Sequence, residues 1–293
     1  MDLRRYLAAR QKEVDRALDR FLPKASAKPA TIHKAMRYSL FAGEKRLRPI
    51  LCLAAAEACR GKIQRGLPLA CAMECIHTYS LIHDDLPSMD NDDFRRGRPT
   101  CHKVFGDGIA VLAGDALLTI AFEIASHAES SRRYGMREIL REIAVAAGSQ
   151  KLIAGQVADL EAEGKRVARA ELRYIHENKT AAILTASVRL GAMSANAREK
   201  ELRAITKFGR ALGLAFQVID DILDVTQTSE KLGKSAGKDV AAKKATYPAV
   251  LGLEKSRAEA QRLTDEAHSA LEMFGDSAAA LRDLAGYLLA REY

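Results

Sequence analysis

Apolar residues recur every three or four positions along nearly the whole chain, and this spacing predicts helices. Residues 3–22 show the pattern first, with Leu3, Leu7, Val14 and Leu18 on one helical face. No segment has the apolar–polar alternation between turn residues that indicates a strand. Further helices are expected at 30–42, from Pro49 through Cys59, at 67–85, 107–127, 136–163 and 201–225, and again within 250–293.

The composition agrees with a helical protein that has no second domain. The 293 residues include only 7 prolines, and the good helix formers Ala, Leu, Glu, Lys and Arg are abundant. The length is near the upper limit for one hydrophobic core, and no change of composition marks a boundary. We therefore predict an all-α protein in which residues 1–293 form a single domain.

The charge balance favours an anionic partner. The formal net charge is +8, which suits nucleic acid, a membrane surface or a phosphorylated small molecule. Aromatic residues make up only 5% of the chain and no long Lys/Arg tract occurs, which argues against a stacking surface for nucleic acid. No stretch is long and apolar enough for us to expect insertion into a membrane.

The five cysteines favour a reducing compartment. An odd number in a long chain without a secretory signal is typical of reduced thiols in the cytoplasm. Cys71 and Cys75 are four residues apart on one helical face, but no further Cys or His ligands occur at matching spacing. We expect both thiols in the core and the protein in the cytoplasm.

Two clusters of aspartates follow apolar helices, and their geometry differs. In "DDILD", Asp220 and Asp224 share a helical face, whereas Asp221 lies about 100° around the helix. In "HDDLPSMD", Asp84 and Asp90 cannot share a face of a continuous helix. Pro87 disrupts helical hydrogen bonding, so we predict a distorted turn that brings Asp90 back beside Asp84.

Carboxylates gathered in this way require a cation. Hard divalent ions take oxygen ligands, and Mg²⁺ uses one or two carboxylates with waters and substrate phosphates. No His/Cys set accompanies the aspartates, which argues against zinc, and the Gly and Glu positions of an EF-hand are missing. The alternative is a pair of solvated acidic helix ends.

Basic residues flank the acidic clusters, and together they predict a metal–diphosphate site. Arg and Lys bind phosphate through charge-assisted hydrogen bonds. Taken singly, each is more typical of a solvated surface, and His77 and His83 are more typical of packed residues. The basic candidates are Lys45, Arg46, Arg48, Arg95, Arg96, Lys179, Lys234 and Lys238.

Six ordered motifs resemble those of the trans-polyprenyl diphosphate synthases, and within that family a bacterial farnesyl diphosphate synthase. They are "GEKRLRP", "IHDDLPSMDNDDFRRGRPT", "GDALLTIAFEI", "KTAAIL", "FQVIDDILD" and "LGKSAGKD". The resemblance implies a bundle of about ten or more helices around a central cavity, usually in a homodimer. It implies head-to-tail condensation of isopentenyl diphosphate with dimethylallyl or geranyl diphosphate.

The resemblance also implies a role for each matching residue. Asp84 and Asp90 would bind two Mg²⁺ ions and Asp220 a third, with Mn²⁺ as an alternative metal. The implied metal-binding set is Asp84, Asp85, Asp90, Asp220, Asp221 and Asp224. The implied ligands of the allylic diphosphate are Arg95, Lys179, Lys234 and Lys244. The implied ligands of isopentenyl diphosphate are Lys45, Arg48, His77 and Arg96. Thr180 and Gln217 would line the reacting carbons and, with Lys179, form the catalytic group.

Product length depends on the helix that precedes Asp84. Tyr79 is five residues upstream of Asp84, about 7.5 Å along a helix axis, where a ring would limit chain growth. In the family, an aromatic residue here and the two-residue insertion in "DDLPSMD" imply the C15 product, farnesyl diphosphate. Geranylgeranyl diphosphate, C20, is the alternative, and Tyr79 would then be ordinary core.

Other functions stay open at the level of sequence. A terpene cyclase also uses Asp-rich helices, but it has no need of the second diphosphate site implied by Lys45, Arg48 and Arg96. A non-catalytic synthase subunit could lose aspartates, whereas this chain keeps both sets. The C-terminal "LLAREY" departs from the basic tail of many relatives, so closure of the site by the tail is in doubt.

Overall fold

The computed structural model describes residues 2–43, 45–226 and 246–289, and these form an all-α bundle, as predicted. Asp2 caps the first helix, because its carboxylate accepts a hydrogen bond from the Arg5 amide at 3.1 Å. The N-terminal half contains α1 (Leu3–Phe21), α2 (Ala30–Leu40), α3 (Leu47–Ala58), α4 (Ile63–Asp84), β1 (Phe94–Arg95), β2 (Arg98–Pro99), α5 (Cys101–Phe105) and α6 (Asp107–Ser126).

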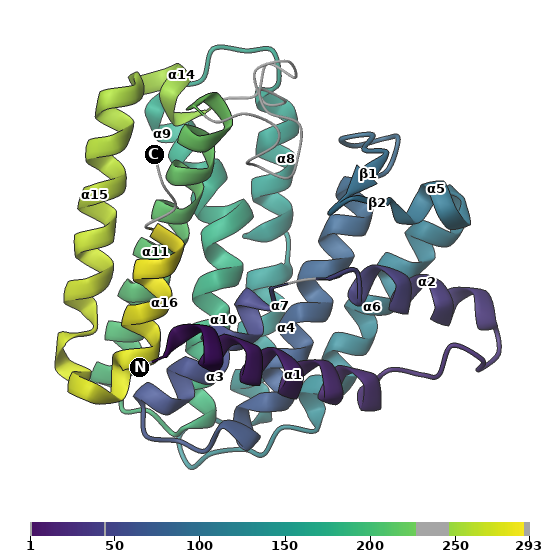
Figure 1. Ribbon diagram of the computed structural model, residues 1–293, viewed down its shortest axis with the longest axis horizontal. Helices are drawn as coiled ribbons and strands as arrows, with labels where there is room; N and C mark the ends of the chain where they lie inside the picture. The colour runs from purple at the N-terminus through teal and green to yellow at the C-terminus, as the bar shows by residue number, and fades with distance from the viewer. Residues whose placement is uncertain (1, 44, 227–245, 290–293) are drawn as a thin grey trace.

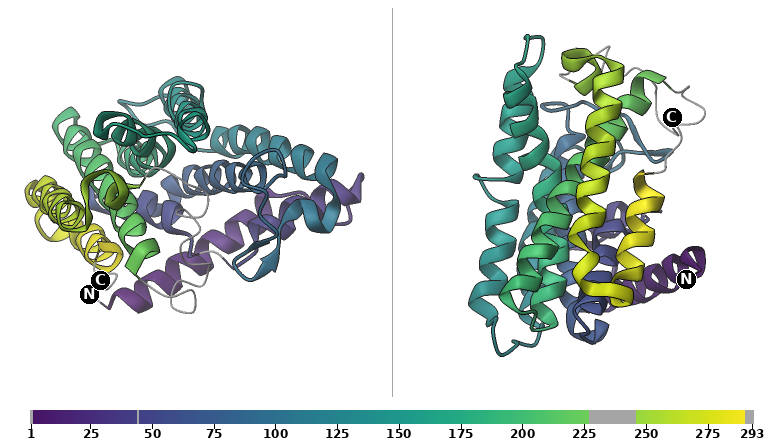
Figure 2. Two further views of the ribbon diagram at one scale, coloured as in Figure 1. Left: turned by 90° about the horizontal axis from the view of Figure 1, so that it is seen from above. Right: turned by 90° about the vertical axis from the view of Figure 1, so that its left-hand side faces the viewer.

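The C-terminal half continues the bundle. It contains α7 (Met136–Ala147), α8 (Leu152–Ala162), α9 (Arg169–His176), the π-helix η1 (Glu177–Ala181), α10 (Ala182–Ser194), α11 (Glu199–Thr226), α14 (Tyr247–Leu251), α15 (Leu253–Ala270), the 3₁₀-helix η2 (Glu272–Ala278) and α16 (Ala279–Leu289). In Figure 1, α8, α10, α11 and α15 run roughly side by side, and α1 lies over α3 and α4, against which it packs. The view from above in Figure 2 shows α1, in purple, along one side of the bundle.

α10 occupies the centre and packs against α3, α4 and α11. Gly191 lets α10 approach α3, because a Cβ atom there would lie 1.9 Å from the carbonyl oxygen of Cys52. One cluster of buried apolar side chains lies between α4 and α6 under α1 and α2. A second lies between α3, α10, α11 and α15. The two clusters hold α4, α10 and α11 in fixed positions, and these helices carry the predicted site.

Two predictions about secondary structure were wrong in detail. The sequence predicted no strands, but the structure contains the antiparallel pair of β1 and β2. Its strands of two residues each are too short to show alternation, and the turn residues Arg96 and Gly97 both have positive φ, as tight hairpins require. The helix expected at 136–163 is interrupted, because Gly148 ends α7 and Lys151 has non-helical angles.

The expectation that no stretch could span a membrane was also wrong for α6. This helix is long and apolar enough to do so by length and composition alone. In the structure it packs along α4, and its residues Leu117 and Ile124 are fully or almost fully buried. A core helix surrounded by other helices needs the same apolar composition.

Candidate active site

A cavity of about 650 Å³ opens between α4, α6, α8 and the segment from η1 to α10. Its polar side chains include Arg48, His77, Asp84, Lys179 and Thr180. The rest of its wall is largely apolar, with Tyr79, Leu86, Leu118, Leu152, Val157 and Ile183. The cavity therefore offers charged groups together with space for a hydrocarbon.

The first aspartate cluster folds as predicted. α4 ends at Asp84, and beyond Pro87 the chain turns back, so that the Asp90 amide donates to the Asp84 carbonyl at 2.9 Å. The Asn91 amide closes the same turn on the Leu86 carbonyl at 3.1 Å. Asp84 and Asp90 are both half-buried, and Asp84 lines the cavity.

Asp85 points to a different environment. It is 3% exposed, and Arg95 donates to its carboxylate from Nε at 2.8 Å and from Nη2 at 2.5 Å. Burial raises the pKa of Asp85 above its ordinary value, although Arg95 opposes this. Asp85, Arg95 and Arg96 line a small pocket of about 30 Å³ beneath the hairpin rather than the main cavity. The metal role of Asp85 and the diphosphate roles of Arg95 and Arg96 stay predictions.

The aspartates of the second cluster also differ in their environments. Asp221 is 2% exposed and accepts hydrogen bonds from Gln217 Nε2 at 3.0 Å and from the Tyr247 amide at 2.9 Å. Asp224 is 3% exposed, and among the residues that the structure describes neither of its oxygens has a hydrogen-bond partner. Asp220 is half-buried. Asp221 thus joins α11 to the start of α14, whereas Asp224 is a buried carboxylate with no hydrogen-bond partner among the described residues.

The donor set fits a hard divalent ion. In the described parts of the chain, no three His, Cys, Asp or Glu side chains already form a metal-binding group. Mg²⁺ does not need such a group, because waters and substrate phosphates complete its shell around one or two carboxylates. The carboxylate of Asp84 in the cavity wall is one such donor, and the oxygens of Asp224, which have no hydrogen-bond partner within the described ranges, are others.

The π-helix η1 brings Lys179 and Thr180 to the cavity. Lys179 Nζ lies 2.7 Å from an Asp159 oxygen on α8 and 3.9 Å from an Asp84 oxygen on α4. Thr180 donates to Gln217 Oε1 on α11 at 3.0 Å. Lys179 and Thr180 of η1 thus contact α4, α8 and α11. The catalytic role of Lys179, Thr180 and Gln217 stays a prediction. Asp159 was missed, since its spacing in α8 resembles that of a surface acid.

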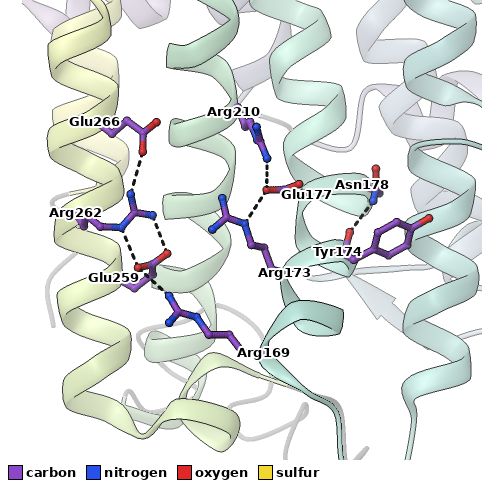
Figure 3. A network of polar contacts seen from close by, with 9 residues as sticks. All are labelled: Arg169, Arg173, Tyr174, Glu177, Asn178, Arg210, Glu259, Arg262 and Glu266. Carbon is purple, nitrogen blue, oxygen red and sulfur yellow. Dashed lines mark hydrogen bonds and ion pairs between the residues drawn. The ribbon is translucent and has the colours of Figure 1, made fainter.

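Three hydrogen bonds hold the first turn of η1 in place (Figure 3). Glu177 accepts hydrogen bonds from Arg173 at 2.9 Å and from Arg210 of α11 at 2.7 Å. Asn178 donates to the Tyr174 carbonyl at 2.8 Å. π-helical turns cluster at functional sites, because the extra residue reorients the side chains around it.

The predicted ligands of isopentenyl diphosphate occupy neighbouring elements. Lys45 is exposed just before α3, Arg48 is half-buried in its first turn, and His77 lies on α4 beside the cavity. Burial lowers the pKa of Arg48 to about 10. Burial, with the nearby charges of Arg48 and Arg95, holds the pKa of His77 well below its ordinary value, so this imidazole is neutral at pH 7.

Tyr79 lies in the apolar wall. It is 6% exposed and meets the His83 ring edge-to-face, with centroids 5.8 Å apart. The His83 Nε2 atom lies 3.0 Å from the Val111 carbonyl oxygen of α6. Tyr79 is therefore fixed beside the seam between α4 and α6. Lys234 and Lys244 lie outside the described residues.

The sequence profile of the polyprenyl synthetase family matches residues 29–283. The chain belongs to this family. It is 50% identical to the large subunit 1 of the chloroplastic heterodimeric geranylgeranyl pyrophosphate synthase of Arabidopsis thaliana, over 99% of this chain and 80% of that protein. This polyprenyl synthetase is therefore a trans-prenyltransferase, and the family depends on Mg²⁺.

Solved structures agree with this assignment. The fold is similar to that of an FPP/GFPP synthase from Zymomonas mobilis, with a TM-score of 0.86, 35% identity and 99% of both chains covered. It is also similar to a geranyltransferase from Helicobacter pylori, with a TM-score of 0.84, 32% identity, and 99% and 97% of the two chains covered. The crystals of the latter contain magnesium and isoprenyl diphosphate.

Proposed function

We propose that this enzyme condenses isopentenyl diphosphate head-to-tail with dimethylallyl and geranyl diphosphate and releases farnesyl diphosphate. The observation that carries the proposal is the cavity of about 650 Å³ in which Asp84, Lys179 and Thr180 share a space with an apolar wall. A diphosphate with a hydrocarbon tail has the same division of polar and apolar surface.

The side chains around η1 suit an ionisation followed by condensation. When bound, Mg²⁺ would neutralise the diphosphate, and Asp84, Asp90, Asp220 and Asp224 are the carboxylates proposed to hold it. Lys179 stabilises the charge that develops as the allylic C–O bond breaks. Arg48 and neutral His77 orient isopentenyl diphosphate so that its double bond attacks the allylic cation. The new cation formed on the isopentenyl carbons then loses a proton to the departing diphosphate, which restores a double bond. The apolar wall limits water, which would otherwise quench that cation.

The proposal of a C15 product depends on Tyr79. Its buried ring lines the cavity and is held against His83, where it would obstruct a longer tail. The name of the Arabidopsis relative supports the alternative of a C20 product, geranylgeranyl diphosphate. The two products differ in whether the tail stops at Tyr79 or passes it.

We further propose that the enzyme is a homodimer in the cytoplasm. Val111 and Leu112 of α6 are 39% and 55% exposed, and Ile153 and Val157 of α8 are 44% and 47% exposed. Exposed apolar groups that lie close together are typical of an interface, and three of these four residues border the same cavity. The five free cysteines support a reducing compartment.

One assay tests the proposal. Purified protein is incubated with Mg²⁺, isopentenyl diphosphate and each allylic primer, the products are sized by chromatography, and the oligomer is measured by light scattering. We expect a C15 product and a dimer. A C20 product would replace the farnesyl assignment, and a cyclic hydrocarbon formed without isopentenyl diphosphate would indicate a terpene cyclase. No turnover with any primer would indicate a non-catalytic subunit.

A further inference from the structure

The side chain of Arg46 is buried, whereas its basic neighbours Lys45 and Arg48 face the solvent and the cavity. Its side chain is 2% exposed, whereas Lys45 is exposed and Arg48 lines the cavity. Lys45 and Arg48 have proposed roles in holding isopentenyl diphosphate. Arg46 points away from them into the protein, so it cannot share that role directly.

The Arg46 guanidinium joins three elements. Its Nε atom donates to Asp15 of α1 at 2.8 Å, and its Nη1 atom donates to Glu74 of α4 at 3.0 Å. The group also lies over the Phe41 ring, 5.6 Å from its centroid. The pKa of Arg46 is raised, because the two carboxylates outweigh the effect of burial, and the side chain remains charged.

The backbone of Arg46 has an uncommon conformation at the start of α3. Its angles, φ 51° and ψ 38°, are left-handed, which is unfavourable for a residue with a Cβ atom. Its carbonyl oxygen accepts the Ile50 amide at 3.0 Å and so begins the helix. The buried side-chain contacts hold this turn, and the turn decides where Lys45 and Arg48 lie.

Glu74, the partner of Arg46 on α4, lies close to the cavity. It is 1% exposed and lies one helical turn before His77 on α4. In the described part of the chain its second carboxylate oxygen has no hydrogen-bond partner. Its charge also acts on Arg48, where it opposes the lowering of the pKa by burial. One buried carboxylate therefore supports Arg46 and attracts Arg48.

We propose that Arg46 and Glu74 are positioning residues for the diphosphate of the non-allylic substrate. Their buried ion pair fixes the turn before α3 against α4, so that Lys45 and Arg48 meet the diphosphate beside His77. This role rests on the proposed function. Stability alone is a weak reason for the pair, because apolar residues of similar volume often stabilise a core equally well.

Two variants test this role. Arg46→Met removes the charge with little change in length, and Glu74→Gln keeps the shape of the side chain. We expect KM for isopentenyl diphosphate to rise by about tenfold to a hundredfold, because small displacements of positioned groups have effects of that size. KM for geranyl diphosphate should change less than about twofold, because the displaced groups Lys45 and Arg48 are not proposed to contact the allylic substrate. Calorimetric titration with isopentenyl diphosphate should show the same loss of affinity.

Arg10→Met is the matched control. Arg10 of α1 pairs with Glu57 near the other end of α3 at 3.0 Å, so its loss also weakens the contact between α1 and α3. We expect a lower melting temperature and an unchanged KM for isopentenyl diphosphate. If Arg46→Met does not fold, Arg46→Lys takes its place, and it should give a smaller rise because an ammonium group cannot reproduce the guanidinium geometry.

The outcomes separate this role from the proposed function. Absence of turnover by the unaltered enzyme would refute the proposed function. Normal turnover together with an unchanged KM for isopentenyl diphosphate in both Arg46→Met and Glu74→Gln would refute the positioning role alone. Equal rises in KM for both substrates, or a rise in Arg10→Met as large as in Arg46→Met, would also refute it.

Discussion

At the scale of single residues, aspartates of one motif have unlike environments. Asp85 is paired with Arg95 and Asp221 with backbone and Gln217, whereas Asp224 is buried with both oxygens unpartnered among the described residues. The partners of a buried carboxylate offset the cost of its burial, whereas burial without a partner is unfavourable until a cation binds. The motifs therefore combine structural residues with residues that favour a ligand.

Asp224→Asn should raise stability and lower activity together. Without Mg²⁺, we expect the free energy of unfolding to rise by about 1 kcal/mol or more, because a neutral amide replaces a buried carboxylate that has no hydrogen-bond partner in the part of the chain that the structure describes. Thermal unfolding would show this as a melting temperature about 2–4 °C higher. kcat should fall about a hundredfold if the residue helps to neutralise the leaving diphosphate. Asp220→Asn, at a half-buried position, is the control and should not raise the melting temperature.

Tyr79→Ala should lengthen the product, because it removes the ring from the apolar wall of the cavity. We expect C20 and longer products by chromatography, whereas Tyr79→Phe keeps the ring and should keep the C15 product. Tyr134→Ala is the control, since Tyr134 donates to the Ala197 carbonyl at 2.9 Å and does not line this cavity. An unchanged product in Tyr79→Ala would contradict a limiting role for the ring.

At the scale of elements, the π-helix η1 is the feature on which the site depends. It is fixed by Glu177 and Asn178 at its start and by close packing against α8 and α11. Gly155 of α8 lies against it so closely that a Cβ atom would be 2.2 Å from the Lys179 amide nitrogen. The place of Lys179 in the cavity is thus set by backbone packing as well as by hydrogen bonds.

Gly155→Ala should impair catalysis by displacing η1. The added methyl group meets backbone, which cannot rotate away, so we expect a lower melting temperature and a kcat reduced by about tenfold to a hundredfold. Gly108→Ala in α6 is the matched control, because a Cβ atom there meets nothing within 4 Å. Equal kcat values in the two variants would contradict the dependence of Lys179 on this contact.

At the scale of the whole molecule, buried histidines make stability depend on pH. His176 is 6% exposed next to Asp221, and burial lowers its pKa to about 4. The unfolded chain binds a proton near pH 6.5, but the folded protein does not. The stability contributed by neutral His176 is therefore complete above that pH and is lost as pH falls towards 4.

His176→Gln should flatten the acid side of the stability profile. Between about pH 6.5 and pH 4 we expect the free energy of unfolding of the unaltered protein to include a loss of about 1.4 kcal/mol per pH unit from this residue. Thermal unfolding across that range should show a smaller slope in His176→Gln. His127→Gln, at an exposed position, is the control and should keep the original slope. Parallel profiles for all three proteins would contradict the assignment.

Local features were predictable because helical period and proline chemistry act over a few residues. The spacing of Leu3, Leu7 and Val14 predicted α1, and Pro87 predicted the turn that returns Asp90 to Asp84. The order of the motifs indicated the family, which the comparisons confirmed. Short strands and the break after Gly148 escaped prediction, since two or three residues are too few to show a period.

The sequence by itself determined the helices, the acidic turns and the chemistry of the motifs. Only the tertiary structure separated Asp224 from Asp221, brought Asp159 to Lys179, and turned Arg46 inward between Lys45 and Arg48. These outcomes depend on which surface each helix buries against elements far away in the chain. Residues of the same type and motif therefore differ in hydration, partner and charge. The spacing of apolar residues along one helix cannot predict these differences, because it does not specify which distant elements the helix packs against.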